Sequence, residues 1–314
     1  MSRIHEALKK AEHERTAIVT AESEVAPPQA EPAAAVPDQS DKMLSQSAEI
    51  LSRTVSPAPR SGEYLRFDDL RTRCAHPVWH LDPNVNVFAN PDSSGPGSEQ
   101  FRTLRSRLYQ IRSNQTLRTL LVTSSIPTEG KTFVTNNLAQ AIIRQPDRRA
   151  LIIDADLRRS RLHVPLGAPS SPGLTDYLRG TADLISIIQQ GPEGNLCFIP
   201  GGDAVTNPSE LIANGRIKVL LDRLVSIFDW IILDSPPCLL VADATVLADH
   251  CDGVLLVTRA GMTPAGTAQR ACQELRGRNV VGVVLNGMQA SHKSHSDYYY
   301  YGYGYGDIKE PTNN

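Results

Sequence analysis

The sequence has no excess of charge of either sign and no long hydrophobic run. It contains 32 lysine and arginine residues against 34 aspartate and glutamate residues, which gives a formal net charge of −2. Without a basic excess, the composition does not favour nucleic acid as a partner. No apolar stretch approaches the roughly 18 to 20 residues that a transmembrane helix needs, and the N-terminus lacks the apolar core of a signal peptide. We therefore expect a cytoplasmic protein.

Cysteines are few and scattered. The five of them form no Cys-x-x-Cys pair, and their odd number does not suit a disulfide framework. This usage is typical of a reducing compartment, and we interpret the cysteines as small core residues. They are Cys74, Cys197, Cys238, Cys251 and Cys272.

Composition divides the chain into four regions. Residues 1–15 contain an amphipathic helical pattern that is too short to be stable alone, and it is either a docking element or a solvated appendage. Residues 16–96 are rich in alanine, proline, serine and acidic residues, which predicts a largely disordered linker. Within it, Glu63 to Phe88 carries four aromatic residues and is a candidate for packing onto the rest of the chain or onto a partner. Residues 97–290 form the main domain, and residues 291–314 a flexible tail.

Strands and helices alternate through the main domain. Buried-strand patterns occur near residues 119–123, 150–154, 196–199, 229–234, 253–258 and 280–286, with helical patterns between them. This alternation predicts an α/β fold, namely a doubly wound, mainly parallel sheet with helices on both faces.

A phosphate-binding loop is predicted between the first strand and the helix that follows it. Ser125 to Thr132 reads Ser-Ile-Pro-Thr-Glu-Gly-Lys-Thr and joins the apolar run 120–122 to a helical segment at 133–143. At a helix N-terminus, unpaired N–H groups and the helix dipole favour phosphate, Lys131 adds a positive charge, and the hydroxyl of Thr132 can bind Mg²⁺. Because Ser125 replaces the usual first glycine, an ordinary surface loop is the alternative. The expected nucleotide contacts are Ser125, Thr128, Glu129, Gly130, Lys131, Thr132 and, at the end of the last strand, Asn286, which is otherwise a turn former.

Three aspartates follow two further buried strands. Asp154 and Asp156 come after the strand at 150–154, and Asp234 ends the strand at 229–234. The carboxyl ends of parallel strands meet at one edge of the sheet, so these carboxylates converge on the phosphate loop unless they only cap the next helices. We expect Lys131, Asp154, Asp156 and Asp234 to be catalytic, with Thr132, Asp154 and Asp234 as ligands of Mg²⁺. Either Asp154 or Asp156 is the candidate base.

The tail combines glycine with a cluster of tyrosines. Six of the nine tyrosines lie between Tyr298 and Tyr305. Beside a phosphate loop they are candidate phosphoryl acceptors, since glycine spacing allows an extended, mobile segment, but the same composition also suits an adhesive low-complexity segment. The candidate acceptors are Tyr298, Tyr299, Tyr300, Tyr301, Tyr303 and Tyr305.

These motifs together resemble the bacterial tyrosine kinases, called BY-kinases. The segments 120–132, 151–158 and 231–236 are similar to the Walker A, Walker A′ and Walker B motifs of that family, and the sequence has no His-Arg-Asp or Asp-Phe-Gly motif of the eukaryotic kinases. Glu99, Arg102 and Arg105 match its Glu-x-x-Arg-x-x-Arg oligomerisation helix, and the tyrosine-rich tail also matches. The resemblance covers roughly residues 97 to 306. Thr128 departs from the glycine usual in the family, and it would strain the loop if that position required a positive φ.

The resemblance implies a fold, an activity and partners. It implies a P-loop NTPase fold of the deviant Walker type shared with partitioning ATPases, and ATP with Mg²⁺ as cofactors. It further implies a ring in which each tail is phosphorylated in trans, a membrane-spanning polysaccharide chain-length or co-polymerase protein as activator, and a phosphotyrosine phosphatase as antagonist. Recruitment to the inner face of the plasma membrane and control of capsular or extracellular polysaccharide would follow.

The sequence is also compatible with two other functions. One is a partitioning or localisation ATPase, although such proteins carry an extra lysine where this chain has Ile126. The other is a nucleotide-binding scaffold of the polysaccharide machinery. Arg158 and Arg159 either offset charge on the phosphoryl group or lie at a subunit interface.

Overall fold

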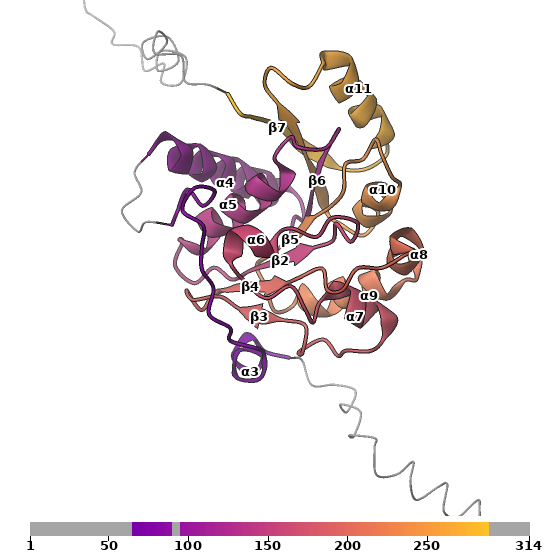
Figure 1. Ribbon diagram of the computed structural model, residues 1–314. Coiled ribbons are helices and arrows are strands. Elements are labelled where there is room, and N and C mark those ends of the chain that lie inside the picture. The colour runs from indigo at the N-terminus through magenta and orange to yellow at the C-terminus, as the bar shows by residue number, and fades with distance from the viewer. Residues whose placement is uncertain (1–64, 90–94, 289–314) are drawn as a thin grey trace, which may run out of the picture. The chain divides into compact units, whose positions relative to one another are not determined.

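A computed structural model describes residues 65–89 and 95–288 (Figure 1). The predicted N-terminal helix, the first part of the predicted linker and the tyrosine-rich tail lie outside these residues, so their predictions stay predictions. Within the described residues, no helix combines the length and the apolar character that crossing a membrane requires.

The centre of the fold is a seven-stranded sheet in the order β3-β4-β2-β5-β1-β6-β7. All neighbouring strands are parallel except β3 and β4, which pair antiparallel. Strands β1, β2 and β5 are buried along their whole length, because helices cover both faces of the sheet, and this explains their continuous apolar sequences. The strands are β1 (Thr119–Ser124), β2 (Ala150–Asp154), β3 (Gln189–Gln190), β4 (Leu196–Ile199), β5 (Trp230–Asp234), β6 (Gly253–Arg259) and β7 (Val280–Asn286).

Helices cover both faces of the sheet (Figure 1), and a separate hydrophobic core lies on each face. The first core is built with α4 (Pro96–Asn114), α5 (Lys131–Ile143) and α6 (His163–Leu166). The second core holds residues of the remaining helices, so the predicted doubly wound sheet is confirmed. These helices are α3 (Phe67–Arg73), α7 (Leu174–Arg179), α8 (Pro208–Ala213), α9 (Arg216–Leu224), α10 (Asp243–Ala248) and α11 (Ala265–Glu274).

The stretch 65–89 packs against the sheet and its helices. Phe67 meets Phe228 edge-on with ring centroids 5.6 Å apart, and Trp79 meets Phe198 in the same way at 6.1 Å. Phe88 is buried beside Phe101 of α4. Residues 65–89 of the predicted linker are therefore folded, and the folded part of the chain begins before the predicted boundary at residue 97. Phe67, Trp79 and Phe88 are the anchors of this stretch.

Candidate nucleotide-binding site

The site lies where β1, β5 and β2 end side by side. The phosphate loop joins β1 to α5, Asp234 is the last residue of β5, and Asp154 is the last residue of β2. The parallel pairing of β2 and β5 places Asp154 in register with Asp234. The strand order thus brings together three segments that are far apart in the sequence, as the sequence predicted.

Two residues of the phosphate loop have left-handed backbone conformations. Gly130, directly before α5, has φ 97°, and Thr128 has φ 66°. A Cβ atom on Gly130 would lie 2.0 Å from the Nδ2 atom of Asn286, so an added methyl group would displace the Asn286 side chain, and the left-handed φ itself favours glycine. The positive φ considered for Thr128 is confirmed. A β-branched residue in this region is strained by about 1–2 kcal/mol.

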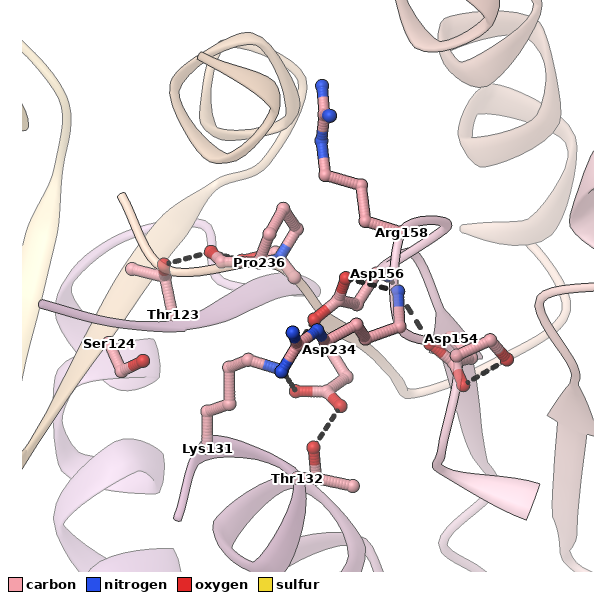
Figure 2. A network of polar contacts seen from close by, with 12 residues as sticks. Thr123, Ser124, Lys131, Thr132, Asp154, Asp156, Arg158, Asp234 and Pro236 are labelled. Atoms are coloured by element: carbon pink, nitrogen blue, oxygen red, sulfur yellow. Dashed lines mark hydrogen bonds and ion pairs between the residues drawn. The ribbon is translucent and has the colours of Figure 1, made fainter. Parts of the chain in front are cut away.

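Lys131 is held between two carboxylates. Its Nζ atom donates to Oδ2 of Asp156 at 2.8 Å and lies 3.8 Å from Oδ1 of Asp234 (Figure 2). Burial opposes the charge of the lysine, but the attraction of Asp234 and Asp156 outweighs this and raises the pKa of Lys131 above its ordinary value. Lys131 is therefore a fixed positive charge at the start of α5.

Thr132 and Asp234 form the part of the site that suits Mg²⁺. The Thr132 hydroxyl donates to Oδ2 of Asp234 at 2.6 Å, while Oδ1 of Asp234 is buried without a hydrogen bond. Burial raises the pKa of the Asp234 carboxyl, and the charge of Lys131 acts in the opposite direction. No group of three or more acidic, histidine or cysteine side chains among the described residues is arranged to hold a metal. A hydroxyl and one carboxylate fit a cation that takes its other ligands from phosphate and water, as Mg²⁺ does.

Both carboxylate oxygens of Asp154 accept hydrogen bonds from the loop that follows β2. Its Oδ2 accepts from the Ser160 hydroxyl at 2.7 Å and from the Leu162 amide at 2.9 Å, and its Oδ1 accepts from the Asp156 amide at 3.3 Å. Burial raises the pKa of Asp154 to about 7, and the charge of Asp234 acts in the same direction. The structure therefore places Asp156, rather than Asp154, against Lys131.

Arg158, two residues after Asp156, points away from Lys131 (Figure 2). The Nε atom of Arg158 donates to Oδ2 of the buried Asp243 at 2.7 Å, and its Nη2 donates to the Ser209 hydroxyl at 2.7 Å. The side chain of Arg159 is exposed, and its backbone amide donates to Oδ1 of Asp156 at 3.1 Å. In this arrangement Arg158 ties the loop after β2 to α8 and α10.

The residues expected to mediate oligomerisation lie on α4. Glu99 and Arg102 form an ion pair one turn apart on this helix. The Nη1 atom of Arg105 donates to the carbonyl oxygen of Ala141 in α5 at 2.6 Å. Arg105 thus anchors α4 to α5 within the chain, so only part of its guanidinium is open to a neighbouring subunit.

Side chains from distant segments contact the phosphate loop, and no local sequence motif predicts these contacts. Glu129, expected to bind nucleotide, is completely buried, and its carboxylate bonds to the amide of Ile126 and to the hydroxyl of Thr263. Asn286 donates from Nδ2 to the carbonyl oxygen of Glu129 at 2.9 Å. Thr263 follows β6 and carries no local motif, so only the fold reveals its contact.

A mainly parallel sheet with a phosphate loop between β1 and α5 defines a P-loop nucleotide-binding protein. No model of a known protein family matches the chain. Tyrosine-protein kinase YwqD of Bacillus subtilis is 32% identical over 216 residues, which are 68% of this chain and 91% of YwqD. Tyrosine-protein kinase CpsD of Streptococcus agalactiae is 34% identical over 203 residues, which are 64% of this chain and 87% of CpsD. The chain therefore belongs to the bacterial tyrosine kinase family, as its motifs predicted.

A longer relative agrees in sequence and in structure. Tyrosine-protein kinase Etk of Escherichia coli is 35% identical over 211 residues, which are 67% of this chain but only 29% of Etk. The solved kinase domain of Etk superposes with a TM-score of 0.62 at 34% identity, covering 66% of this chain and 81% of that domain. The chain thus spans less than a third of the length of this relative and matches its kinase domain.

Proposed function

We propose that the chain is an ATP- and Mg²⁺-dependent tyrosine autokinase that phosphorylates tyrosines of its own C-terminal tail. The observation that carries this proposal is the contact of Lys131 with Asp156 and Asp234 beside the left-handed turn at Gly130. Relatives named as tyrosine kinases support it. The acceptors would be Tyr298 to Tyr305, which lie outside the described residues.

Different residues of the site would have different roles in phosphoryl transfer. The amides at the start of α5 and Lys131 would bind the phosphates, and Thr132 and Asp234 would hold Mg²⁺, which offsets the negative charge of the transferred group when bound. For this, Lys131 must exchange its contact with Asp156 for a phosphate oxygen.

Asp156 is the better candidate for the base. A tyrosine hydroxyl has an ordinary pKa of about 10, so its proton must pass to a nearby acceptor during transfer. Oδ2 of Asp156 becomes free when Lys131 turns to phosphate, whereas both oxygens of Asp154 accept hydrogen bonds from neighbouring residues. We therefore assign proton transfer to Asp156 and a supporting role to Asp154.

The proposal also includes how the subunits assemble and what the kinase does in the cell. We infer that phosphorylation occurs in trans within a ring formed through the α4 surface around Glu99 and Arg102, and that phosphate charge on the tails disperses the ring. We also infer a cytoplasmic protein, recruited to the membrane by a membrane-spanning co-polymerase and opposed by a phosphotyrosine phosphatase, that controls polysaccharide synthesis or export. These roles rest on the resemblance of the motifs.

One observation favours a second function, that of a nucleotide-binding scaffold. Thr128 occupies a left-handed conformation in which a threonine is strained. We infer that the chain binds nucleotide less tightly than it would with glycine at this position. A scaffold would bind nucleotide and assemble partners with little phosphoryl transfer.

The deciding experiment is incubation of the purified protein with ATP and Mg²⁺, followed by mapping of phosphotyrosine by mass spectrometry. Lys131→Met is the matched inactive variant, and the cytoplasmic end of a candidate membrane partner is added if the protein alone is silent. Phosphate on Tyr298 to Tyr305 that disappears in the variant is the expected result. Turnover of ATP with an unmodified tail, even with the partner present, would refute the kinase and favour a switch or scaffold.

A further inference from the structure

A negatively charged side chain in a phosphate-binding loop requires an explanation. Glu129 directly precedes Gly130, and a carboxylate that faced the phosphates would repel them. Its side chain instead points into the protein and is completely buried. A buried carboxylate is costly unless donors satisfy it, so its partners indicate its role.

Both carboxylate oxygens of Glu129 have partners. Oε2 accepts from the backbone amide of Ile126 at 2.8 Å, which closes the first half of the phosphate loop on itself. Oε1 accepts from the hydroxyl of Thr263, which in turn accepts from the backbone amide of Arg259 at 2.9 Å. Thr263 therefore connects the phosphate loop to the segment that follows β6.

Residues at the ends of β6 and β7 also hold the backbone of the phosphate loop. Nη1 of Arg259 donates to the carbonyl oxygen of Thr128 at 3.1 Å, and Nδ2 of Asn286 donates to the carbonyl oxygen of Glu129 at 2.9 Å. The ends of β6 and β7 thus contact the two residues before Gly130. A left-handed threonine persists only where its surroundings determine its conformation, and these contacts are such surroundings.

We propose that Glu129 and Thr263 are positioning residues for the phosphate loop, and that neither touches the nucleotide. They would fix the loop in the shape in which its amides point at phosphate. This inference rests on the proposed nucleotide site, but it concerns binding and not phosphoryl transfer.

The test compares Thr263→Val with Thr263→Ser. Valine has the shape of threonine but leaves Oε1 of Glu129 buried without a donor, whereas serine retains the hydroxyl. Loss of such a charged hydrogen bond should raise the dissociation constant for Mg²⁺–ATP about tenfold in the valine variant, and the serine variant should stay near the wild-type value. Thr267→Val is the matched control, because Thr267 lies on α11 with an exposed hydrogen bond to Arg270.

A second measurement on the nucleotide-free protein separates positioning from general destabilisation. Hydrogen exchange at the Ile126 amide should accelerate in Thr263→Val, because that amide bonds to Glu129, while the amides of β1 and β5 keep their protection. Wild-type affinity in Thr263→Val, or unchanged exchange at Ile126, would overturn the inference, as would equal losses in Thr263→Val and Thr267→Val. A wild-type protein that binds Mg²⁺–ATP but leaves its tail unmodified, even with the cytoplasmic end of the membrane partner present, would refute the kinase and leave this inference standing.

Discussion

The variant Asp156→Asn should separate nucleotide binding from phosphoryl transfer. In the structure Nζ of Lys131 lies 2.8 Å from Oδ2 of Asp156, and the two side chains are only 14% and 6% exposed. A hydrogen bond between charged groups contributes about 1.5–3 kcal/mol, and part of it must be given up when Lys131 contacts phosphate. Asparagine weakens this competing contact while it preserves the size of the side chain.

The two expected effects therefore have opposite signs. Because Lys131 retains Asp234 at 3.8 Å, only part of the bond energy is released, and we expect Mg²⁺–ATP to bind about three- to tenfold more tightly. Phosphorylation of the tail should fall about 10²- to 10⁴-fold, the usual contribution of a general base. Calorimetry gives the affinity, and a single-turnover experiment with labelled ATP gives the rate.

Weaker nucleotide binding in Asp156→Asn would refute this reasoning. It would mean that Asp156 helps to hold the nucleotide or its metal and does not compete for Lys131. A wild-type rate of phosphorylation would reject Asp156 as the base. Asp154→Asn is the control. Among the hydrogen bonds of the described residues Asp154 makes none to Lys131, and its charge acts on Lys131 more weakly than those of Asp234 and Asp156, so binding should tighten less than in Asp156→Asn.

Three further changes give measurable outcomes. The pKa of Asp154 is raised from 3.8 to about 7, so the folded state binds a proton that the unfolded state has already lost, and the free energy of unfolding should fall as the pH rises from about 4 to 7. In urea unfolding without Mg²⁺, Asp154→Asn should be more stable than wild type at about pH 8 but not at about pH 5. Thr128→Gly should remove the strain at φ 66° and raise the melting temperature or leave it unchanged, the net gain being at most about 1 kcal/mol; a clear fall would contradict a strained loop. Gly130→Ala should weaken Mg²⁺–ATP binding about tenfold or more in calorimetry, and adding Asn286→Ala should restore little, because the left-handed φ remains after the clash is removed. Full recovery in that double variant would show that crowding alone matters.

The sequence predicted the sheet well because its strands are buried on both faces. Each predicted strand coincides with an observed one to within a residue at either end. The short strand Gln189–Gln190 was missed, since two glutamines carry no apolar signal and pair only at the edge of the sheet. The packing of residues 65–89 was only suspected, because contacts such as Trp79 on Phe198 join distant parts of the chain.

The sequence predicted which residues form the site, but not where some of their side chains point. Lys131, Thr132 and Asp234 meet as expected, because strand ends and a loop motif determine their places. The choice of Asp156 over Asp154 as the partner of Lys131 depends on how a short loop turns after β2, which no pattern encodes. The inward direction of Glu129 depends on Thr263, which lies 134 residues further along the chain.

The contact between Asn286 and the phosphate loop also bears on the order of synthesis. The loop is made early, but Asn286 ends β7, the last strand in the described part of the chain. A ribosome must therefore release the C-terminal end of the sheet before the loop acquires all its contacts, since domains emerge N-terminal end first. During synthesis, the phosphate loop should therefore be the part of the site that matures last, although its residues are made before those of β5, β6 and β7.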